Sequence, residues 1–87
     1  MAEVYFEPPS EDIYSAAIQS WYVEEGDVVE AGEELVEMRT ETDEYFTITA
    51  PVSGILKERY YEEDDEVEVG EVIAEIEEKE ETEEEEK

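Results

Sequence analysis

A chain of 87 residues is long enough for one small domain, and such a domain buries only about 60% of the surface that its unfolded chain exposes. Its 31 acidic and 5 basic residues give a net charge of −26, which excludes nucleic acid and anionic membranes as partners, because binding to phosphate needs Lys or Arg. The sequence has neither Cys nor His, which excludes disulfides, structural zinc sites and Ser-His-Asp triads.

We expect neither a membrane span nor a secretory signal. No run approaches roughly 18 apolar residues, and the N-terminus lacks a basic start followed by an apolar core. A cytoplasmic location and a monomer in isolation are the corresponding expectations. Partners of so acidic a chain are expected to be basic proteins or cations, although a solvated, self-repelling surface is the plainer interpretation of the glutamates.

The first predicted strand spans residues 3–7, where Val, Tyr and Phe favour a pleated, half-buried surface. Two prolines at positions 8 and 9 end this strand, because neither can donate to a ladder of hydrogen bonds. Residues 10–14 are then expected to form a surface loop.

A second strand is predicted over residues 17–23, with Ile18 and Trp21 as its core anchors. The spacing of these two residues departs from strict alternation, which predicts a bulge between them. A turn over residues 24–27 follows, in which Gly26 supplies a positive φ.

A β-hairpin is predicted around residues 41–44, which form its tip. Apolar residues lie on the strands to either side: Leu35, Val36 and Met38 before the tip, and Tyr45, Phe46 and Ile48 after it. A turn over residues 51–54 follows. Helices are not predicted anywhere, because the apolar residues come in short runs broken by Gly and Pro.

The second half of the chain repeats the first. Residues 24–38 align with residues 62–76, and eight of the fifteen pairs are identical while four more keep an apolar residue. Asp64 replaces Gly26, and Asp tolerates left-handed turn conformations better than most residues. Two copies of one strand-and-turn unit predict an all-β domain with a pseudo-twofold internal repeat.

The apolar pattern stops at Glu77. Residues 77–87 comprise eight Glu, two Lys and one Thr, so they have nothing to bury that would compensate for the loss of chain entropy. We therefore expect a folded domain over residues 1–76 and a disordered acidic tail over residues 77–87.

One pattern extends over nearly the whole predicted domain. Residues 21–29 read Trp-Tyr-Val-Glu-Glu-Gly-Asp-Val-Val, and residues 50–54 read Ala-Pro-Val-Ser-Gly. Single positions complete it: Gly32, Leu35, Glu37, Val67, Val69, Gly70, Ile73 and Ala74. Joined to the internal repeat, this pattern resembles the lipoyl/biotinyl carrier domains of dihydrolipoamide acyltransferases and biotin carboxyl carrier proteins. The resemblance implies a flattened barrel of two four-stranded antiparallel sheets, with the hairpin that carries a modified lysine in relatives at one end and the chain termini at the other.

The acceptor lysine of that family is missing from this hairpin. Counting forward from Gly32 places the acceptor position on Thr42, and counting back from Pro51 places it on Asp43. Matching the lipoyl motif itself places it on Glu44. The counts disagree because the hairpin is one residue longer than the family pattern. None of the three is Lys, and none can form the amide that holds lipoate or biotin.

Only three lysines exist in the chain: Lys57, Lys79 and Lys87. Lys57 is predicted to be a surface residue in the middle of a strand, and the other two lie in the tail. We therefore expect no lipoyl or biotinyl cofactor, unless an atypical lysine such as Lys57 is modified.

The candidate residues for partner binding lie in two segments, the loop over residues 8–16 and the hairpin over residues 39–46. They are Tyr14, Thr42, Asp43, Glu44 and Tyr45. Exposed aromatic side chains favour protein interfaces, although the tyrosines also fit the simpler role of strand residues that cover the barrel.

No catalytic residues and no dedicated metal site are predicted. Residues 62–66 are five carboxylates in a row, but they lack the glycine and the ligand spacing of a calcium loop. With 31 acidic residues, a pair of neighbouring carboxylates carries almost no information about catalysis.

Three functions fit these expectations. The first is a non-catalytic docking or structural module that has lost its lysine and binds a protein of an acyltransferase or carboxylase complex. The second is a genuine carrier domain modified at an unorthodox lysine. The third is a stand-alone acidic protein on the same scaffold.

Overall fold

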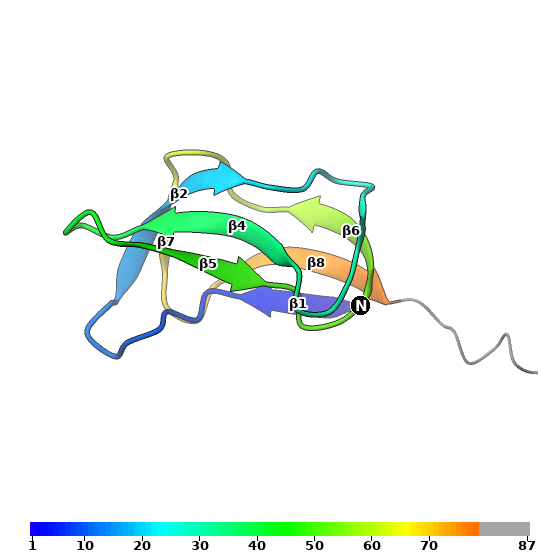
Figure 1. The fold of residues 1–87 in the computed structure, drawn as a ribbon, viewed down its shortest axis with the longest axis horizontal. Coiled ribbons are helices and arrows are strands. Elements are labelled where there is room, and N and C mark those ends of the chain that lie inside the picture. The colour runs from blue at the N-terminus through cyan, green and yellow to red at the C-terminus, as the bar shows by residue number, and fades with distance from the viewer. Residues whose placement is uncertain (79–87) are drawn as a thin grey trace, which may run out of the picture.

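The computed structural model describes residues 1–78, which form eight β-strands (Figure 1). They are β1 (Ala2–Tyr5), β2 (Ser15–Trp21), β3 (Val28–Val29), β4 (Glu34–Arg39), β5 (Tyr45–Thr49), β6 (Gly54–Arg59), β7 (Glu66–Glu68) and β8 (Val72–Glu78). One sheet has the order β1-β8-β6-β3 and the other β5-β4-β2-β7, and the strands pair antiparallel. The predicted pair of four-stranded antiparallel sheets is therefore confirmed. The described part of the chain has no helix that is long and apolar enough to cross a membrane.

The core lies between the two sheets, where the buried side chains of both are apolar. Its largest fully buried side chains come from both halves of the chain: Phe6, Ile18, Leu35, Met38, Leu56, Ile73 and Ile76. Phe46 packs against this cluster, with its ring centroid 5.9 Å from that of Phe6. Ile18 is a core anchor as predicted. Trp21 is partly buried, and its indole N–H donates to the Tyr61 carbonyl at 3.0 Å.

Strand β2 contains the bulge that the spacing of its core anchors predicts. Its register with β4 shifts between Ile18 and Ser20. The shift turns the following part of the strand, so that both Ile18 and Trp21 reach the core. The strand also begins at Ser15, two residues before the predicted start, because Ser15 and Ala16 pair with β7.

A turn in the first half of the chain is hydrogen-bonded to a strand of the second half. The Gly26 N–H donates to the Leu56 carbonyl at 2.7 Å, and the Leu56 N–H donates to the Asp27 carbonyl at 2.9 Å. Within the turn, the Asp27 carboxylate accepts the Glu24 N–H at 2.8 Å. Gly26 has a φ of 97°, in the left-handed region that favours glycine.

The second half repeats these bonds on the first. The Asp64 N–H donates to the Ile18 carbonyl at 2.8 Å, and the Ile18 N–H donates to the Asp65 carbonyl at 2.9 Å. The Asp65 carboxylate accepts the Glu62 N–H at 2.9 Å. Asp64 has a φ of 74°, so it takes the left-handed conformation of Gly26. The predicted pseudo-twofold repeat is therefore confirmed down to single hydrogen bonds.

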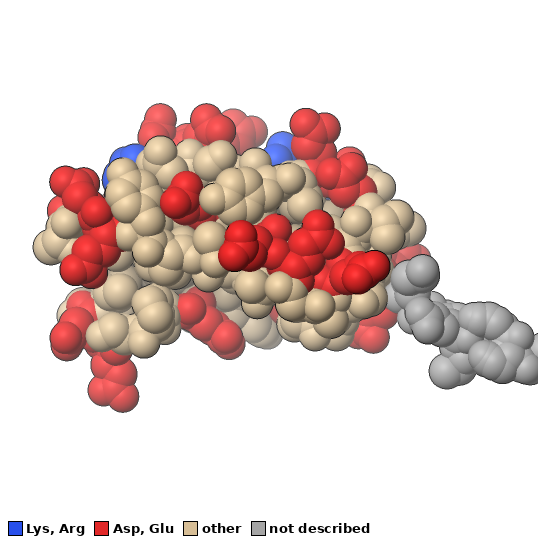
Figure 2. All heavy atoms as spheres, viewed as in Figure 1, with Lys and Arg blue, Asp and Glu red and all other residues tan. Residues whose placement is uncertain are grey.

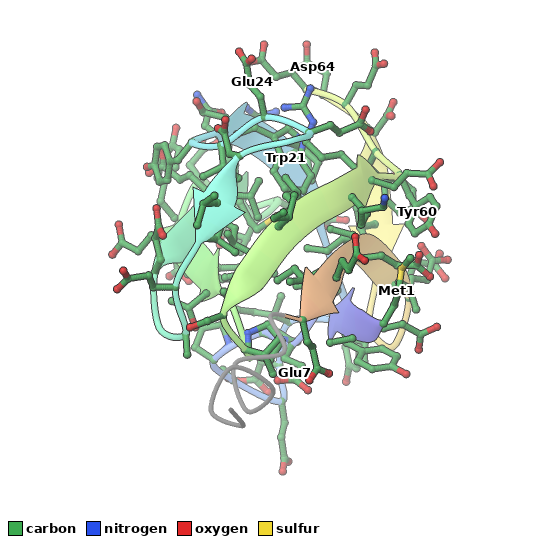
Figure 3. All side chains as sticks on the ribbon, turned by 90° about the vertical axis from the view of Figure 1, so that its right-hand side faces the viewer. Met1, Glu7, Trp21, Glu24, Tyr60 and Asp64 are labelled. Carbon is green, nitrogen blue, oxygen red and sulfur yellow. The ribbon has the colours of Figure 1, made fainter. Side chains whose placement is uncertain are left out.

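Trp21 lies below these two turns in the view that labels Glu24 and Asp64 (Figure 3). The Arg59 guanidinium lies over its ring, 5.3 Å from the centroid, and donates to the Val23 carbonyl at 3.1 Å. This cation–π contact joins β6 to β2, which belong to different sheets.

Strand β8 runs through Glu78, two residues beyond the predicted end of the domain at residue 76. Glu77 and Glu78 pair with the start of β6, so backbone hydrogen bonds rather than apolar burial hold them. Gly54 is required at this point, because a Cβ there would lie 2.1 Å from the Glu77 carbonyl oxygen. The rest of the predicted tail, residues 79–87, lies outside the described residues.

Carboxylates cover the described part of the chain. Residues 1–78 have 25 acidic side chains and only three basic ones, Arg39, Lys57 and Arg59. Figure 2 shows acidic side chains spread over the whole face that it presents, with few basic ones among them. So many like charges on a small domain repel one another and lower its stability.

Replacing Asp64 with Gly is expected to raise the free energy of unfolding by about 0.5–1 kcal/mol. A side chain in the left-handed region is strained by roughly 1–2 kcal/mol, and the greater freedom of glycine in the unfolded chain cancels part of the gain. Urea unfolding of D64G measures the effect. D64N is the matched control, since it removes the same charge but keeps a side chain. Equal stability of the two variants would contradict strain at this position.

Neutral salt is expected to raise the melting temperature, because ions screen repulsion among exposed carboxylates over a Debye length of about 10 Å at 0.1 M. Thermal unfolding in sodium chloride between about 0.01 M and 1 M measures this effect. Sodium chloride is preferred to sulfate, which stabilises proteins by being excluded from their surface. A melting temperature that stays constant or falls would refute the repulsion.

Candidate functional site

The predicted hairpin tip is a three-residue loop, residues 41–43, at the end of the molecule opposite the N-terminus (Figure 1). The Thr40 N–H donates to the Glu44 carbonyl at 2.8 Å, which closes the loop. The Asp43 N–H donates to the Thr40 carbonyl at 3.0 Å, and Asp43 has a φ of 66°. This geometry is typical of three-residue hairpin loops, in which a turn is followed by a left-handed residue.

Thr40 holds the loop from inside and was not among the predicted site residues. It is the one buried polar residue of the described chain, at 6% exposure. Its hydroxyl oxygen accepts the N–H of Glu44 at 3.0 Å and that of Thr42 at 3.3 Å, and lies 3.1 Å from the Thr42 hydroxyl. A Thr directly after a predicted strand and ahead of a turn is the signal that points to such a role.

The three candidate acceptor positions occupy different parts of the loop. Thr42 and Asp43 lie within it, whereas Glu44 lies at its base, where its N–H is bonded to Thr40. All three side chains are exposed. The most projecting part of the tip is therefore Glu41, Thr42 and Asp43.

The side chains of the tip do not fit a lipoyl or biotinyl group. Either group is held by an amide to a lysine ε-amine, which acts as a nucleophile once it is deprotonated. The tip offers one hydroxyl, on Thr42, and the carboxylates of Glu41, Asp43 and Glu44. Neither a hydroxyl nor a carboxylate can supply the nitrogen of that amide.

Lys57 lies on the surface of β6, an interior strand of its sheet. Its ammonium group is 3.5 Å from the Glu77 carboxylate, and its side chain is 45% exposed. The residue therefore belongs to a flat strand surface and not to a projecting turn. Within residues 1–78, no group of three or more carboxylates is placed to hold a metal ion.

The loop before β2 and the hairpin tip lie next to each other in the structure. Residues 12–15 and residues 40–42 line a shared hollow of about 150 Å³. Tyr14 is 76% exposed at its rim. Tyr45 is 53% exposed and does not line this hollow.

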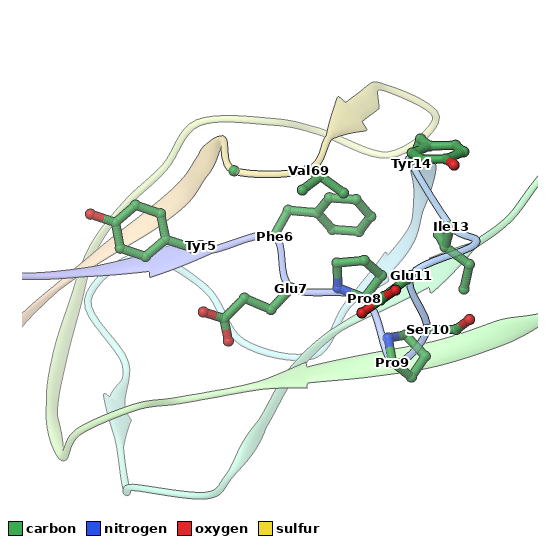
Figure 4. Close-up of a pocket in the computed structure, with 11 residues that line it drawn as sticks. Tyr5, Phe6, Glu7, Pro8, Pro9, Ser10, Glu11, Ile13, Tyr14 and Val69 are labelled. Carbon is green, nitrogen blue, oxygen red and sulfur yellow. The ribbon is translucent and has the colours of Figure 1, made fainter.

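A second and larger hollow of about 710 Å³ adjoins the first, because Ile13 and Tyr14 line both. We call it the apolar groove, defined by Tyr5–Glu11, Ile13, Tyr14, Val69 and Gly70 (Figure 4). Tyr5 and Val69 were not among the predicted site residues. The available signal was an apolar Val beside a turn glycine in an otherwise acidic segment.

The charged groups around the apolar groove are all acidic. Glu7 and Glu11 line it, and no Lys or Arg does. Beside it, the Tyr5 hydroxyl donates to the Glu3 carboxylate at 2.5 Å. This hydrogen bond, together with the negative charge of Glu3, raises the pKa of Tyr5 above its usual value.

Residues 6–76 match the biotin/lipoyl family, whose description reads "Biotin-requiring enzyme". The chain belongs to this family. The match spans all the strands except β1 and the last two residues of β8, so it covers both sheets and the hairpin tip. A search of curated protein sequences gives no significant match.

Two solved structures have the same fold. The lipoyl domain of the 2-oxoglutarate dehydrogenase complex from Azotobacter vinelandii has a TM-score of 0.66 at 23% identity, over 86% of this chain and 96% of that domain. The urea carboxylase of Kluyveromyces lactis has a TM-score of 0.71 at 24% identity, over 85% of this chain but only 6% of its own. Identities this low show the fold alone.

Replacing Thr40 with Val is expected to destabilise the protein by about 1–2 kcal/mol, because two N–H groups of the tip lose their acceptor while the shape of the side chain is kept. Hydrogen exchange should accelerate at the amides of Thr42 and Glu44 more than at strand amides. T49V, at an exposed threonine of β5, is the matched control. Unchanged exchange at the tip of T40V would show that the hydroxyl does not order the loop.

Proposed function

We propose that this biotin/lipoyl-family domain is a non-catalytic docking module that carries neither lipoate nor biotin. The observation that carries the proposal is the chemistry of the hairpin tip. An ordered, projecting loop presents Glu41, Thr42 and Asp43 where attachment needs an amine. The scaffold is kept, but its attachment chemistry is replaced.

A protein partner within a multienzyme assembly fits this proposal. One structural relative is a domain of a 2-oxoglutarate dehydrogenase complex, and the other is part of a carboxylase. We infer that the present domain binds a component of an acyltransferase or carboxylase assembly.

The proposed contact surface is the end of the molecule that carries the tip. The loop before β2 and the tip share a hollow there, while the N-terminus lies at the other end (Figure 1). The end with the tip is therefore free to meet a partner when the chain is attached through its N-terminus. The residues proposed to contact the partner are Tyr14, Thr42, Asp43, Glu44 and Tyr45.

Modification at Lys57 is the main alternative. The position of Lys57 within a paired strand and its contact with Glu77 argue against it, because a ligase has to reach the ε-amine in its own active site. The ion pair is exposed and weak, so the strand geometry carries more of this argument than the ion pair does.

Incubation with a lipoate ligase and lipoate, and with a biotin ligase and biotin, is expected to leave the intact mass unchanged. The lipoyl domain of the Azotobacter vinelandii complex is the positive control for the first reaction. A mass increase in the parent chain would overturn the proposal. Its loss in K57R would then assign the modification to Lys57.

The variants T42K and D43K separate the scaffold from the attachment chemistry. At least one of them is expected to gain a lipoyl or biotinyl mass, because each places an amine on the projecting loop. If neither is modified while both remain folded, the ligases reject the shape of the tip as well as its side chains.

A further inference from the structure

The apolar groove, a hollow of about 710 Å³, lies beside the tip and not at it. We propose that the apolar groove binds a bulky apolar side chain carried by a basic segment of a partner protein. This inference rests on the proposed docking function and deepens it, because it names the chemistry of the partner.

The groove leaves a patch of apolar surface exposed on an otherwise acidic domain. Phe6, at 1% exposure, belongs to the core and closes the groove on its inner side. Tyr5, Tyr14 and Val69 line it and are 43%, 76% and 51% exposed. Contiguous apolar surface of this kind marks interaction sites more often than scattered apolar residues do.

Backbone hydrogen bonds hold the two sides of the groove together. The Phe6 N–H donates to the Glu71 carbonyl at 2.9 Å, and the Val69 N–H donates to the Tyr14 carbonyl at 3.0 Å. Pro8 and Pro9 restrict the backbone between these points. The groove is therefore largely preformed, which lowers the entropy lost when a side chain enters it.

The negative charge around the groove favours a basic segment as the carrier of this apolar side chain. Glu7 and Glu11 line the groove, and Asp12 lines the adjoining hollow. Lys and Arg on either side of an apolar residue would meet these carboxylates while the apolar residue enters the groove. An aromatic side chain suits this role because it buries a large apolar area, about 150–250 Å².

A second copy of the chain is a poorer occupant. Residues 1–78 have 25 acidic and three basic side chains, so two copies would bring like charges together at the rim. Like charges that face each other across an interface disfavour association. A basic partner instead gains from both the charge and the groove.

The test uses the full 87-residue chain and a synthetic peptide, Lys-Lys-Ser-Phe-Ser-Lys-Lys. A second peptide with Ala in place of Phe keeps the same charge and serves as the control. We expect the Phe peptide to bind about tenfold more tightly than the Ala peptide. This ratio should persist when added salt weakens the binding of both peptides. Amide chemical shifts of the labelled protein should move at Tyr5, Ile13 and Val69.

Three variants locate the site. V69S and Y14A are expected to reduce binding of the Phe peptide about fivefold or more, and to leave binding of the Ala peptide nearly unchanged. V28S is the matched control, because Val28 is 63% exposed on β3 and does not line the groove. Thermal unfolding of each variant checks that it remains folded. If V69S does not fold, Y14A still tests the groove.

Equal binding of the two peptides would overturn the proposal that the groove binds an apolar side chain. Chemical-shift changes spread evenly over the acidic surface would overturn it as well. So would a loss of binding in V28S that matches the loss in V69S. Each of these three results leaves the proposed docking function in place. That function fails separately, if a ligase modifies the parent chain.

Discussion

Reciprocal hydrogen bonding between the two halves of the chain is the constraint on which the rest of the structure depends. The turn over residues 24–27 bonds to β6, and the turn over residues 62–65 bonds to β2. Neither half can satisfy these backbone groups without the other, and an unpaired buried N–H group is unfavourable by about 1–3 kcal/mol. The halves therefore form one unit, and most strands that are neighbours in sequence lie in different sheets.

This interlocking explains why one hairpin projects from the molecule. Among the described strands, β4 and β5 are the only consecutive ones that pair with each other. Every other connection crosses from one sheet to the other. The counterpart of β4 in the internal repeat is β8, which ends near the N-terminus at the opposite end (Figure 1). The tip and the adjoining loop before β2 therefore lie at the end of the molecule opposite the N-terminus and the end of β8.

Sequence alone predicted the fold because the features that define it are regular. The turn glycines and the apolar positions recur 38 residues apart, with Asp64 in place of Gly26. They take their predicted places in the turns and in the core. The tip was also located, since its position follows from the strands around it. The apolar groove was not predicted, because it brings together residues 5–14 and the turn at Val69, which are distant in sequence. Thr40 was missed because its role depends on burial of one hydroxyl.

The acidic charge and the apolar groove act over different distances. Charge attracts a basic partner over a Debye length of about 10 Å and mainly affects the rate of association. Apolar contact acts only on close approach and mainly affects how long the complex lasts. Glu41, Asp43 and Glu44 extend the acidic field to the end of the molecule that carries the groove. Under the two proposals, the acidic side chains of the tip therefore favour the same kind of partner as the groove does.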